Sequence, residues 1–497
     1  MTTRTVKFRL YIAWNGASYV DESAYLEAAS GTLRLAPPDQ AGTSSRGQVD
    51  ACTLTLANAD RRFSPLNEDG DLYSELQNGG AYQRPMYLEV SIDNGSNYYR
   101  VFTGVIKLPQ ESTATLSQGG TVTIECRSLD ELLLQRRWST RLANMIYRIG
   151  HMEGDHIAGL LADISASTYY ADHGVYPLAY AWLDDESVLD ELWAMASACG
   201  GRVYCDPDGN LRYEDATHWL KSPHLTSQET FTRASFQTLS ANYDDKDLYN
   251  VVSIETSPRQ LGVRDTLWEP DEVVSVPPDS TKSITARFKQ AAYVVDAPSF
   301  SASTSGGVDI TSDVSINPTI YVQRAELEIT NANTSYAAYL RPFKLVGVPL
   351  LGGPTQEEKR TTTADGTNSA WWTGRGDRTR TIRGNAYIQT RAQASSLAHF
   401  LLRRSENARL TWKLGGVAGV ASRRLGDRVT INDAEIMTNT RTGWITAISW
   451  RLSLGGGFSQ DIEIMDSAGV YPYEGEYFVL GTNKLGTTDP LKGVVFF

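Results

Sequence analysis

The fold of this chain is organised around residues 184–214, DDESVLDELWAMASACGGRVYCDPDGNLRYE. Apolar side chains recur there at positions 188, 189, 192, 193, 196 and 199, which predicts a helix with one buried face. Ser187, followed three residues later by Asp190, supplies a side-chain cap, and Gly200-Gly201 supplies a left-handed stop. Two short alternating strands follow, joined by a Pro- and Gly-containing turn at 206–209. The stretch predicts a helix–hairpin α+β module whose role is packing.

The composition indicates a large protein of several domains. With 497 residues, the chain can hold roughly three to five domains of the usual ~100–200 residues. Its formal charge of −12 argues against a protein that grips nucleic acid through phosphates, but it permits a surface past which DNA slides. No stretch approaches ~18 consecutive apolar residues, and the N-terminus lacks an apolar signal-peptide core. We therefore expect no membrane span, and synthesis in a cytoplasm.

Residues 1–127 have the pattern of many short strands separated by turns. Residues 50–56 alternate between apolar and polar side chains, and so do residues 121–126. Residues 87–92 and 98–106 are predicted to form a hairpin, because the segment between them is rich in turn-forming residues. Short strands at this spacing predict an N-terminal β-barrel.

An α+β module is expected to follow over residues 128–235. Ser128 with Glu131 has the spacing of a capping box and predicts the start of one helix. Asp155 predicts the start of a second, and the helix–hairpin of residues 184–214 completes the module.

The rest of the chain is predicted to form a second β-barrel that is interrupted by an insertion. Residues 236–256 and 383–470 contribute its strands and one helix, whose start is predicted by Thr390 with Gln393. Residues 257–382 are rich in Pro, Ser, Thr and Gly, which predicts an inserted β domain with long loops, the longest from Gly352 to Arg380.

The second barrel is predicted to repeat the first. Val90-Ser-Ile-Asp-Asn is followed, fourteen residues after Val90, by Gly104-Val-Ile, and Val429-Thr-Ile-Asn-Asp is followed at the same distance by Gly443-Trp-Ile. Downstream, the segment that begins at Val122 matches the segment 461–465 within one or two residues. Similar spacing across three strands predicts two related barrels. The fold class is therefore mainly β with small α+β modules, in several domains.

The sequence contains only weak candidates for an active site. Asp184-Asp185-Glu186 and Asp244-Asp245 could supply paired carboxylates for glycoside hydrolysis. The bland alternative is strong, because acids are favoured at helix N-termini and in polar connectors. His151 and His156 are five residues apart and lack the Glu of a zinc-protease helix.

The other reactive residue types also have ordinary explanations. Cys52, Cys126, Cys199 and Cys205 lack the spacing of a metal knuckle and are expected to be small buried hydrophobes. Arg375-Gly376-Asp377, close to Trp371-Trp372, matches an adhesion tripeptide, although a polar loop tip is the simpler interpretation. We therefore assign no catalytic, cofactor-binding or metal-binding residue.

Several motifs, in their order along the chain, resemble one protein family. They are Asn58-Ala-Asp-Arg-Arg-Phe-Ser-Pro-Leu-Asn67, Phe102-Thr-Gly-Val-Ile106, the helix–hairpin with its Cys-Gly-Gly-Arg-Val-Tyr and Asp-Gly-Asn-Leu-Arg segments, Asp244 to Val252, Leu425-Gly-Asp-Arg-Val429, and Tyr477-Phe-Val-Leu-Gly-Thr-Asn-Lys-Leu-Gly486. Together they resemble siphophage tail-tip hub proteins, often called minor tail proteins, which are related to the baseplate hub of contractile phages. The resemblance covers most of the chain and is weakest over residues 257–382.

The resemblance implies a structural role without enzymatic activity. It implies a homotrimeric ring of tandem β-barrels, located at the tail tip of a virion and assembled in the host cytoplasm. One pseudo-sixfold face would meet the distal tail protein or the tail tube. The other, threefold face would meet fibre, spike or receptor-binding proteins, and the tape measure protein is a further expected partner. DNA would pass through the ring without specific binding, and no cofactor is implied. The alternative is a carbohydrate-directed tail hydrolase or a glycan-binding protein.

Two further expectations concern the surface and the C-terminus. A ring that lets DNA pass should line its lumen with acidic or neutral residues, because cationic walls would retain phosphates. Residues 471–497 are predicted to form a Gly-rich C-terminal arm whose apolar side chains pack on their own subunit or fasten a neighbouring one. Many members of the family carry a further C-terminal domain, for which this arm is too short, so the resemblance predicts a scaffold.

Overall fold

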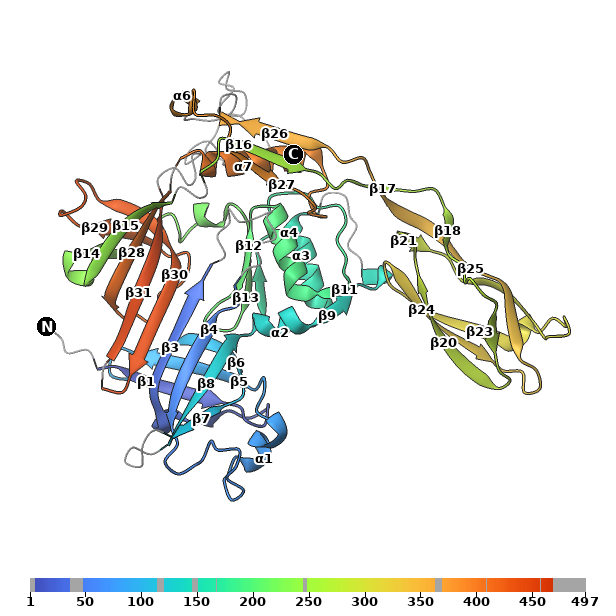
Figure 1. Cartoon of the computed structure of the whole chain (residues 1–497), viewed down its shortest axis with the longest axis horizontal. Helices are drawn as coiled ribbons and strands as arrows, with labels where there is room; N and C mark the ends of the chain where they lie inside the picture. The colour runs from blue at the N-terminus through green and yellow to red at the C-terminus, as the bar shows by residue number, and fades with distance from the viewer. Residues whose placement is uncertain are drawn as a thin grey trace.

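The computed structural model describes residues 5–35, 48–113, 120–144, 151–166, 168–244, 248–362, 369–407, 409–455 and 457–467. Figure 1 shows a body of β-sheets and a few helices, from which an arm of strands projects to the right. The prediction of a mainly β chain with several sheets is confirmed. None of the described helices is both long and apolar enough to cross a membrane.

One large sheet of 14 strands forms most of the body. Its strands are β1 (Lys7–Ile12), β2 (Val20–Asp21), β3 (Leu26–Arg34), β4 (Ala51–Ala57), β5 (Pro85–Ser91), β6 (Tyr99–Ile106), β7 (Gln110–Thr113), β8 (Gly120–Ser128), β14 (Glu229–Thr232), β15 (Thr238–Asp244), β28 (Arg409–Ala418), β29 (Arg428–Asn432), β30 (Arg441–Ser453) and β31 (Gly457–Asp466). The order is β15-β28-β31-β30-β3-β4-β8-β6-β5-β1-β2, with β7 paired to β8, β29 to β30 and β14 to β29.

The prediction of two closed barrels is wrong for the strands that the structure describes, because they pair into one open, branched sheet. β3 pairs with β4 on one side and with β30 on the other, so the N-terminal strands join the C-terminal strands instead of closing on themselves. The physical reason is a shared interior. Leu54 of β4, Phe102 of β6, Trp450 of β30 and Ile462 of β31 belong to one hydrophobic core.

The predicted repeat appears as two groups of five strands with the same pairing order. The N-terminal group runs β5-β6-β8-β4-β3, and the C-terminal group runs β29-β30-β31-β28-β15. Gly104 of β6 lies opposite Ser128, the last residue of β8, and Gly443 of β30 lies opposite Asp466, the last residue of β31. A Cβ atom at Gly104 would lie 2.0 Å from the carbonyl oxygen of Arg127, and one at Gly443 would lie 2.3 Å from that of Met465. The two glycines are therefore structurally equivalent.

The groups also share an irregularity. In the C-terminal group the β30–β31 register shifts by one residue between Ile445 and Ala447. In the N-terminal group the register shifts by one residue between the β6–β8 pairs and the β7–β8 pairs. The equivalent glycines and the shared register shift show that β6 corresponds to the first half of β30. They also show that β7 corresponds to its second half.

The matching valines of the sequence repeat are not equivalent. Met86 faces Gly104, whereas Val429 faces Gly443, so Val90 lies four residues away from the true counterpart of Val429. The Val90–Val429 part of the prediction is wrong. The prediction for β8 and β31 is confirmed within its stated tolerance of one or two residues.

The helix–hairpin module forms as predicted. α4 (Val188–Ala198) begins after Ser187, whose hydroxyl accepts a hydrogen bond from the Asp190 N–H at 3.3 Å. Gly200 adopts a positive φ of 69° just beyond the helix. β12 (Arg202–Cys205) and β13 (Leu211–Glu214) form the hairpin, and β10 (Tyr169–Ala171) pairs with β13 in parallel. Apolar residues of α4 and of the hairpin enter a second core that includes α7 (Arg391–Ser405).

Three predicted helix starts need correction or confirmation. Ser128 does not cap α2 (Asp130–Gln135); its hydroxyl instead accepts a hydrogen bond from the Asp50 N–H at 3.0 Å. α3 (Glu153–Asp163) begins two residues before Asp155, whose carboxylate accepts from the Met152 N–H at 3.2 Å. Thr390 caps α7 as predicted, by accepting from the Gln393 N–H at 3.1 Å.

A three-stranded sheet packs beside α7. It consists of β16 (Val251–Glu255) between β26 (Glu357–Thr361) and β27 (Thr379–Ile382). The prediction of one long loop from Gly352 to Arg380 is therefore wrong, because this segment contains β26, the short helix α6 (Ser369–Trp372) and the first two residues of β27.

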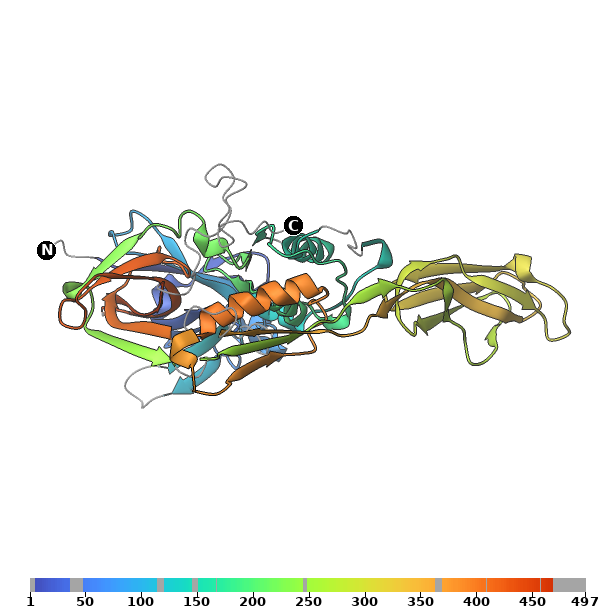
Figure 2. The ribbon, with the colours of Figure 1, turned by 90° about the horizontal axis from the view of Figure 1, so that it is seen from above.

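The projecting arm is built around β25 (Ala338–Gly352), a strand of 15 residues. The other strands of the arm are β17 (Arg259–Leu261), β18 (Asp265–Trp268), β19 (Val274–Val276), β20 (Ser280–Arg287), β21 (Ala291–Val295), β22 (Ser299–Ser303), β23 (Val314–Ile320) and β24 (Arg324–Asn331). They enclose a separate small core. Figure 2 shows that the arm extends away from the body in the second view as well.

The remaining elements are short. They are α1 (Tyr73–Leu76), β9 (Arg137–Ser139), β11 (Asp184–Ser187) and the 3-10 turns η1 (Ser23–Tyr25), η3 (Gln77–Gly79), η4 (Leu142–Asn144), η5 (His218–Leu220), η6 (Arg233–Ser235) and η7 (Thr311–Asp313).

Candidate assembly and channel surfaces

One face of the large sheet is rich in hydroxyl side chains. Alternate residues of β3, β4, β8, β28, β30 and β31 are buried, so the residues between them face solvent. We call this solvent-facing side the channel face. Its neutral polar residues include Ser30, Thr32, Thr53, Thr55, Thr121, Thr123, Thr411, Ser449 and Ser459. The Thr32 and Ser449 hydroxyls lie 3.2 Å apart across the β3–β30 junction.

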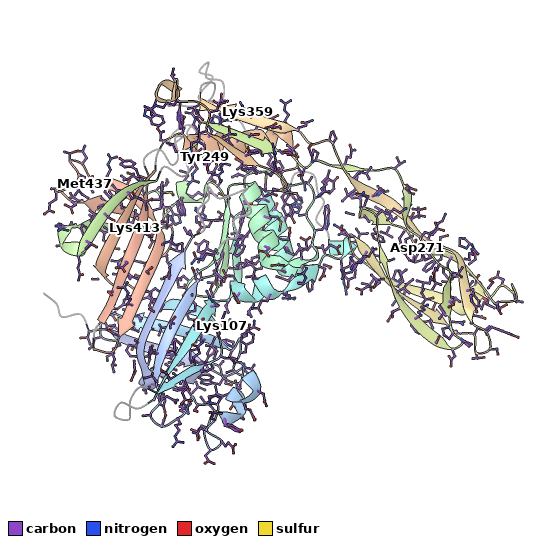
Figure 3. The ribbon with its side chains drawn as sticks, in the orientation of Figure 1. Lys107, Tyr249, Asp271, Lys359, Lys413 and Met437 are labelled. Carbon is purple, nitrogen blue, oxygen red and sulfur yellow. The ribbon has the colours of Figure 1, made fainter. Side chains whose placement is uncertain are left out.

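The charges on the channel face are balanced. Four acidic and four basic side chains of the described strands lie there: Glu27, Glu125, Asp461, Glu463, Arg34, Arg127, Lys413 and Arg451. Glu463 contacts Arg34 at 2.8 Å and Lys413 at 3.1 Å, and Figure 3 shows Lys413 on β28. Arg451 contacts Asp461 at 3.0 Å. Exposed ion pairs stabilise little, but they cancel charge locally. The face is neutral and hydroxyl-rich rather than acidic.

Four strands of the large sheet have an unpaired side among the described residues: β2, β7, β14 and β15. β15 has seven residues and pairs with β28 alone, and β7 pairs with β8 alone. β15 exposes its side chains at positions 240–243, and β7 exposes Gln110, Glu111 and Ser112. An edge strand is a template for pairing with another chain, and neither β15 nor β7 contains a proline or a positively charged residue within the strand.

A second surface combines tyrosine and arginine on the outer side of β1, β5 and β6. The Tyr11 and Tyr87 rings stack with their centroids 4.8 Å apart, and Tyr19 packs edge-on to Tyr87 at 4.9 Å. The Arg100 guanidinium lies 4.3 Å from the Tyr87 ring centroid. Tyrosine and arginine are enriched at protein interfaces, so this surface is a candidate contact with another protein.

A buried ion pair lies within the hairpin, and stacked aromatic rings connect its arginine to the C-terminal strands. The Arg202 Nε and Glu214 Oε2 atoms lie 2.5 Å apart, and Tyr204 donates its hydroxyl to Glu214 at 2.7 Å. Burial alone would raise the pKa of Glu214, but Arg202 and its other partners outweigh burial and hold it below the ordinary value. The Arg202 guanidinium also stacks on Trp219 at 3.6 Å, and Trp219 stacks on Trp444 of β30 at 5.4 Å.

The acidic cluster predicted as a candidate site lies on β11 rather than in a helical turn. Asp184 contacts Arg324 at 3.4 Å, and Asp185 contacts Arg137 at 3.5 Å. Glu186 is hydrogen-bonded to Glu191, a residue of α4 that sequence reasoning missed. Burial, followed by the Glu186 carboxyl, raises the pKa of Glu191 to about 8.

This arrangement does not match a glycosidase. Retaining enzymes hold their two carboxyls ~5 Å apart and inverting enzymes hold them further apart, with space for substrate between them. Here the two carboxyls are in hydrogen-bond contact, and Tyr387 donates its hydroxyl to Glu191. The only sequence signal for Glu191 was its place in the first turn of an amphipathic helix. Of the second candidate pair, Asp244 ends β15, and Asp245 lies outside the described residues.

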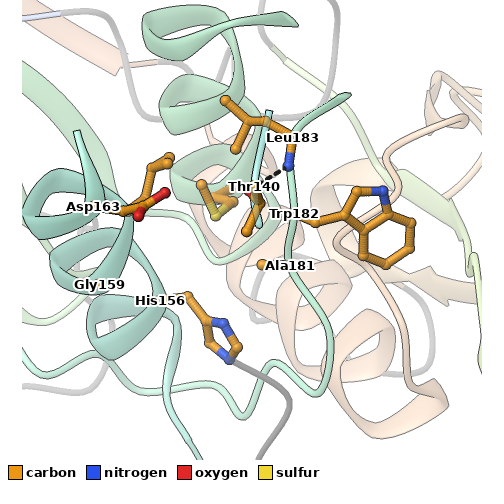
Figure 4. A pocket seen from close by; sticks show the side chains of 9 residues that line it. Thr140, His156, Gly159, Asp163, Ala181, Trp182 and Leu183 are labelled. Carbon is orange, nitrogen blue, oxygen red and sulfur yellow. Dashed lines mark hydrogen bonds between the residues drawn. The ribbon is translucent and has the colours of Figure 1, made fainter. Parts of the chain in front are cut away.

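His151 and His156 lie near each other, with ring centroids 6.3 Å apart. His156 Nε2 contacts the Leu178 carbonyl oxygen at 2.5 Å, and burial lowers the pKa of His156 to about 4. Figure 4 shows His156 beside a pocket that Asp163, Trp182 and Leu183 also line. The pocket has a volume of about 20 Å³, enough for about one water molecule and far too small for a sugar.

The remaining candidates have structural surroundings. All four cysteines are buried, as expected, and Cys52 lies directly opposite Cys126 in the β4–β8 pair. Within the described ranges, no group of three or more His, Cys, Asp or Glu side chains could hold a metal ion. Arg375 of the Arg-Gly-Asp tripeptide lies over the Trp371 ring at 4.0 Å, and the Gly376 carbonyl accepts a hydrogen bond from Asn250 at 2.8 Å. The predicted C-terminal arm, residues 471–497, lies outside the described residues.

No protein-family model matches the sequence, and no curated protein matches it. Among solved structures, the tail protein from Neisseria meningitidis MC58 is similar at 13% identity and a TM-score of 0.48, over 94% of this chain and 98% of that protein. The 43 kDa tail protein of prophage MuSo2 from Shewanella oneidensis is similar at 12% identity and a TM-score of 0.46, over 93% and 100%. The E. coli c3393 protein, a type VI secretion component with structural similarity to the T4 bacteriophage tail proteins gp27 and gp5, is similar at 8% identity and a TM-score of 0.40, over 93% and 76%. The structure of this chain is thus similar to structures of phage tail proteins.

Proposed function

We propose that this chain is the structural hub of a bacteriophage tail tip and forms a homotrimeric ring. The observation that carries the proposal is the internal repeat of five strands, with equivalent glycines at Gly104 and Gly443 and the same one-residue shift. Three copies with two such groups each would present six similar units to a sixfold tail and remain threefold elsewhere. The motif order described above supports the same role.

The channel face supports passage of DNA through the ring. Its threonine and serine side chains offer no fixed positive charge, and Arg34, Lys413 and Arg451 are paired with carboxylates. Binding of a DNA backbone depends on cations that neutralise phosphates, so a face of this kind would let DNA slide without holding it.

The proposed partners follow from the ring. The distal tail protein or the tail tube would contact the pseudo-sixfold side, and fibre, spike or receptor-binding proteins would contact the threefold side, with the tape measure protein as a further partner. The proposed location is the virion tail tip, after assembly in the host cytoplasm.

We propose the same division into parts that the sequence predicts, with one change. Residues 1–127, 128–235 and 471–497 stay as predicted, and the second hub part includes 236–256 and 383–470. The pairing of β26 and β27 with β16 favours moving residues 357–382 from the insertion to that second part.

The mass of the native assembled particle tests the proposal. Three copies per ring are expected, together with a threefold image whose outline has six similar lobes. A chain that remains a monomer in native tail tips would overturn it.

The carbohydrate-directed alternative is tested separately. Incubation of the assembled ring with peptidoglycan or host polysaccharide should release no reducing sugar and should show no saturable glycan binding. Release of sugar that is lost in a Glu186→Gln variant would replace the structural role with a hydrolase.

A further inference from the structure

We propose that β15 of one copy pairs with β7 of the next copy, and that this contact joins the ring. The inference rests on the proposed function, because it assumes that copies of this chain assemble with one another. It adds the strands, the register and the residues of the contact.

The starting point is the junction between the two groups inside one chain. β3 pairs with the second half of β30, from Ala28 opposite Ser453 to Arg34 opposite Ala447. β3 is the outer strand of the N-terminal group, so this junction connects an outer strand of one group to the middle of the other.

The repeat identifies the counterparts of both strands. β15 flanks β28 in the C-terminal group as β3 flanks β4 in the N-terminal group. β7 corresponds to the second half of β30, because Gln110 lies opposite Thr123 after the shift as Ser449 lies opposite Asp461. Applying the relation between the groups once more places β15 of one copy against β7 of another.

β15 has partly exposed apolar side chains at the positions where those of β3 are buried. Ala29 and Leu33 of β3 are each 4% exposed and belong to the hydrophobic core that β30 shares. Their counterparts on β15 are Leu239 and Tyr243, and Tyr243 is 67% exposed. Leu239 is half-buried against the core, so the row that is fully buried on β3 is partly open on β15, which indicates a missing neighbour.

The register follows from the internal junction. Gly31 opposite Trp450 becomes Ala241 opposite Glu111, and Ser30 opposite Arg451 becomes Ser240 opposite Ser112. The Glu111 carboxylate accepts hydrogen bonds from Asn58 at 3.1 Å and Ser64 at 2.8 Å, so it is held to its own subunit. Pro109 would lie opposite Tyr243, a position that an edge strand tolerates.

The same junction would then alternate within and between chains around the ring. Each contact adds backbone hydrogen bonds between β15 and β7 and covers Leu239, Ala241 and Tyr243. The channel faces of neighbouring copies become continuous, because Ser240 and Ser112 lie on the hydroxyl-bearing side, where Ser112 contacts Thr121 at 3.2 Å.

Cysteine cross-linking tests the register. Directly opposite residues of antiparallel strands have Cα atoms about 4.5–5.5 Å apart, which suits a disulfide. A Ser112→Cys/Ser240→Cys variant, assembled and oxidised, should give covalent dimers and trimers on a non-reducing gel. Each single variant should give none, and the four native cysteines are buried. The matched control is Ser112→Cys/Ala241→Cys, whose side chains leave opposite faces of the strands and should not cross-link.

A surface variant gives an independent measure. Tyr243→Lys should raise the concentration needed for assembly by roughly ten- to a hundredfold. The reason is that Tyr243 becomes buried only when copies assemble, so its replacement weakens the contact between copies. The melting temperature of the isolated chain should not change.

The outcomes separate the inference from the proposed function. If three-copy particles form but the Ser112→Cys/Ser240→Cys variant gives no cross-links, the β15–β7 contact is overturned and the hub role stays intact. The same holds if the Ser112→Cys/Ala241→Cys control cross-links equally well. A chain that never assembles would overturn both.

Discussion

Replacement of Glu191, a residue of α4, by glutamine should remove most of the pH dependence that this part of the chain gives to the free energy of unfolding. Glu191 lies in the first turn of α4, accepts a hydrogen bond from the Tyr387 hydroxyl and is hydrogen-bonded to Glu186. Burial, followed by the Glu186 carboxyl, raises its pKa from 4.5 to about 8. At neutral pH the folded protein therefore keeps a proton on Glu191 that the unfolded chain releases.

The sign and size of the effect follow from this difference in pKa. Folding takes up a proton between the two values, so the free energy of unfolding falls as the pH rises from about 4.5 through about 8. At about 1.36 kcal/mol for each pH unit, the interval corresponds to at most roughly 5 kcal/mol. Allowing for the partial exposure of this residue, we expect a loss on the order of 3 kcal/mol between pH 5 and pH 9. Glu191→Gln keeps a neutral hydrogen-bonding side chain and cannot lose a proton.

Urea unfolding of the isolated chain at pH 5, 6, 7, 8 and 9 measures the effect. The wild-type midpoint should fall steadily, whereas the Glu191→Gln midpoint should fall much less and should exceed that of the wild type at pH 9. Glu27→Gln is a matched control, because Glu27 is exposed and should leave the wild-type profile unchanged. Parallel profiles for the wild type and Glu191→Gln would refute the assignment of a buried, protonated Glu191.

Four further predictions concern the repeat, the buried ion pair, the channel face and the C-terminal arm. Gly443→Ala should destabilise the chain by about 1–3 kcal/mol, because the added Cβ would clash with the Met465 carbonyl oxygen. Gly352 has open space around it, so Gly352→Ala is the control and should change stability little; thermal melting compares the two variants. Arg202→Met should lower stability by about 3–5 kcal/mol by leaving Glu214 buried without its cation, and an added Glu214→Gln should restore part of it in urea titrations. Thr53→Lys/Thr123→Lys should leave the melting temperature within a few degrees and slow DNA release from assembled virions, more so at low salt; release at the normal rate would contradict the channel role. Deletion of residues 473–497 should lower the melting temperature if the arm packs on its own subunit, or block assembly of a folded chain if it fastens a neighbour; an unaffected protein in both assays would exclude both ideas.

The helix–hairpin could be predicted from sequence because its signals are local. Ser187, Asp190, Gly200 and the 206–209 turn each act within a few residues, and the structure contains the helix and both strands where these signals place them. The capping prediction at Ser128 failed for the opposite reason. Its hydroxyl is engaged by Asp50, a residue that is distant in sequence and becomes adjacent only when β4 pairs with β8.

The segment after Gly352 shows the same limit on a larger scale. Glu357–Thr361 and Thr379–Ile382 are mostly polar and lack a long apolar alternation, so they resembled a loop. They become strands because each pairs with one side of β16. β16 lies about one hundred residues before β26 in the sequence, so this partner is not visible locally. Their stability comes from this pairing and from α7 rather than from their own composition.

The candidate site divides in the same way. The alternation of β4 and β8 indicated which residues face solvent, so the neutral side of the sheet could be anticipated. The pairing of Glu186 with Glu191 could not, because it depends on the pairing of β11 with β9 just before α4 begins. The cluster 184–186 looked like a set of helix-terminal acids because β11, the strand that contains it, has too few residues to show a pattern.

The internal repeat shows which kind of sequence signal carries structural information. The Val90 and Val429 segments match in letters and in spacing, yet their registers differ by four residues, because any alternating strand satisfies such a match. Gly104 and Gly443 are equivalent because each position excludes a Cβ, where the neighbouring carbonyl oxygen would lie within 2.0 and 2.3 Å. A residue fixed by close backbone approach identifies one position in a sheet, whereas an apolar residue identifies only a face. The register of the β15–β7 contact therefore follows from these glycines and the shift beside them, and the same two features would locate the contact in any chain built from the same repeat.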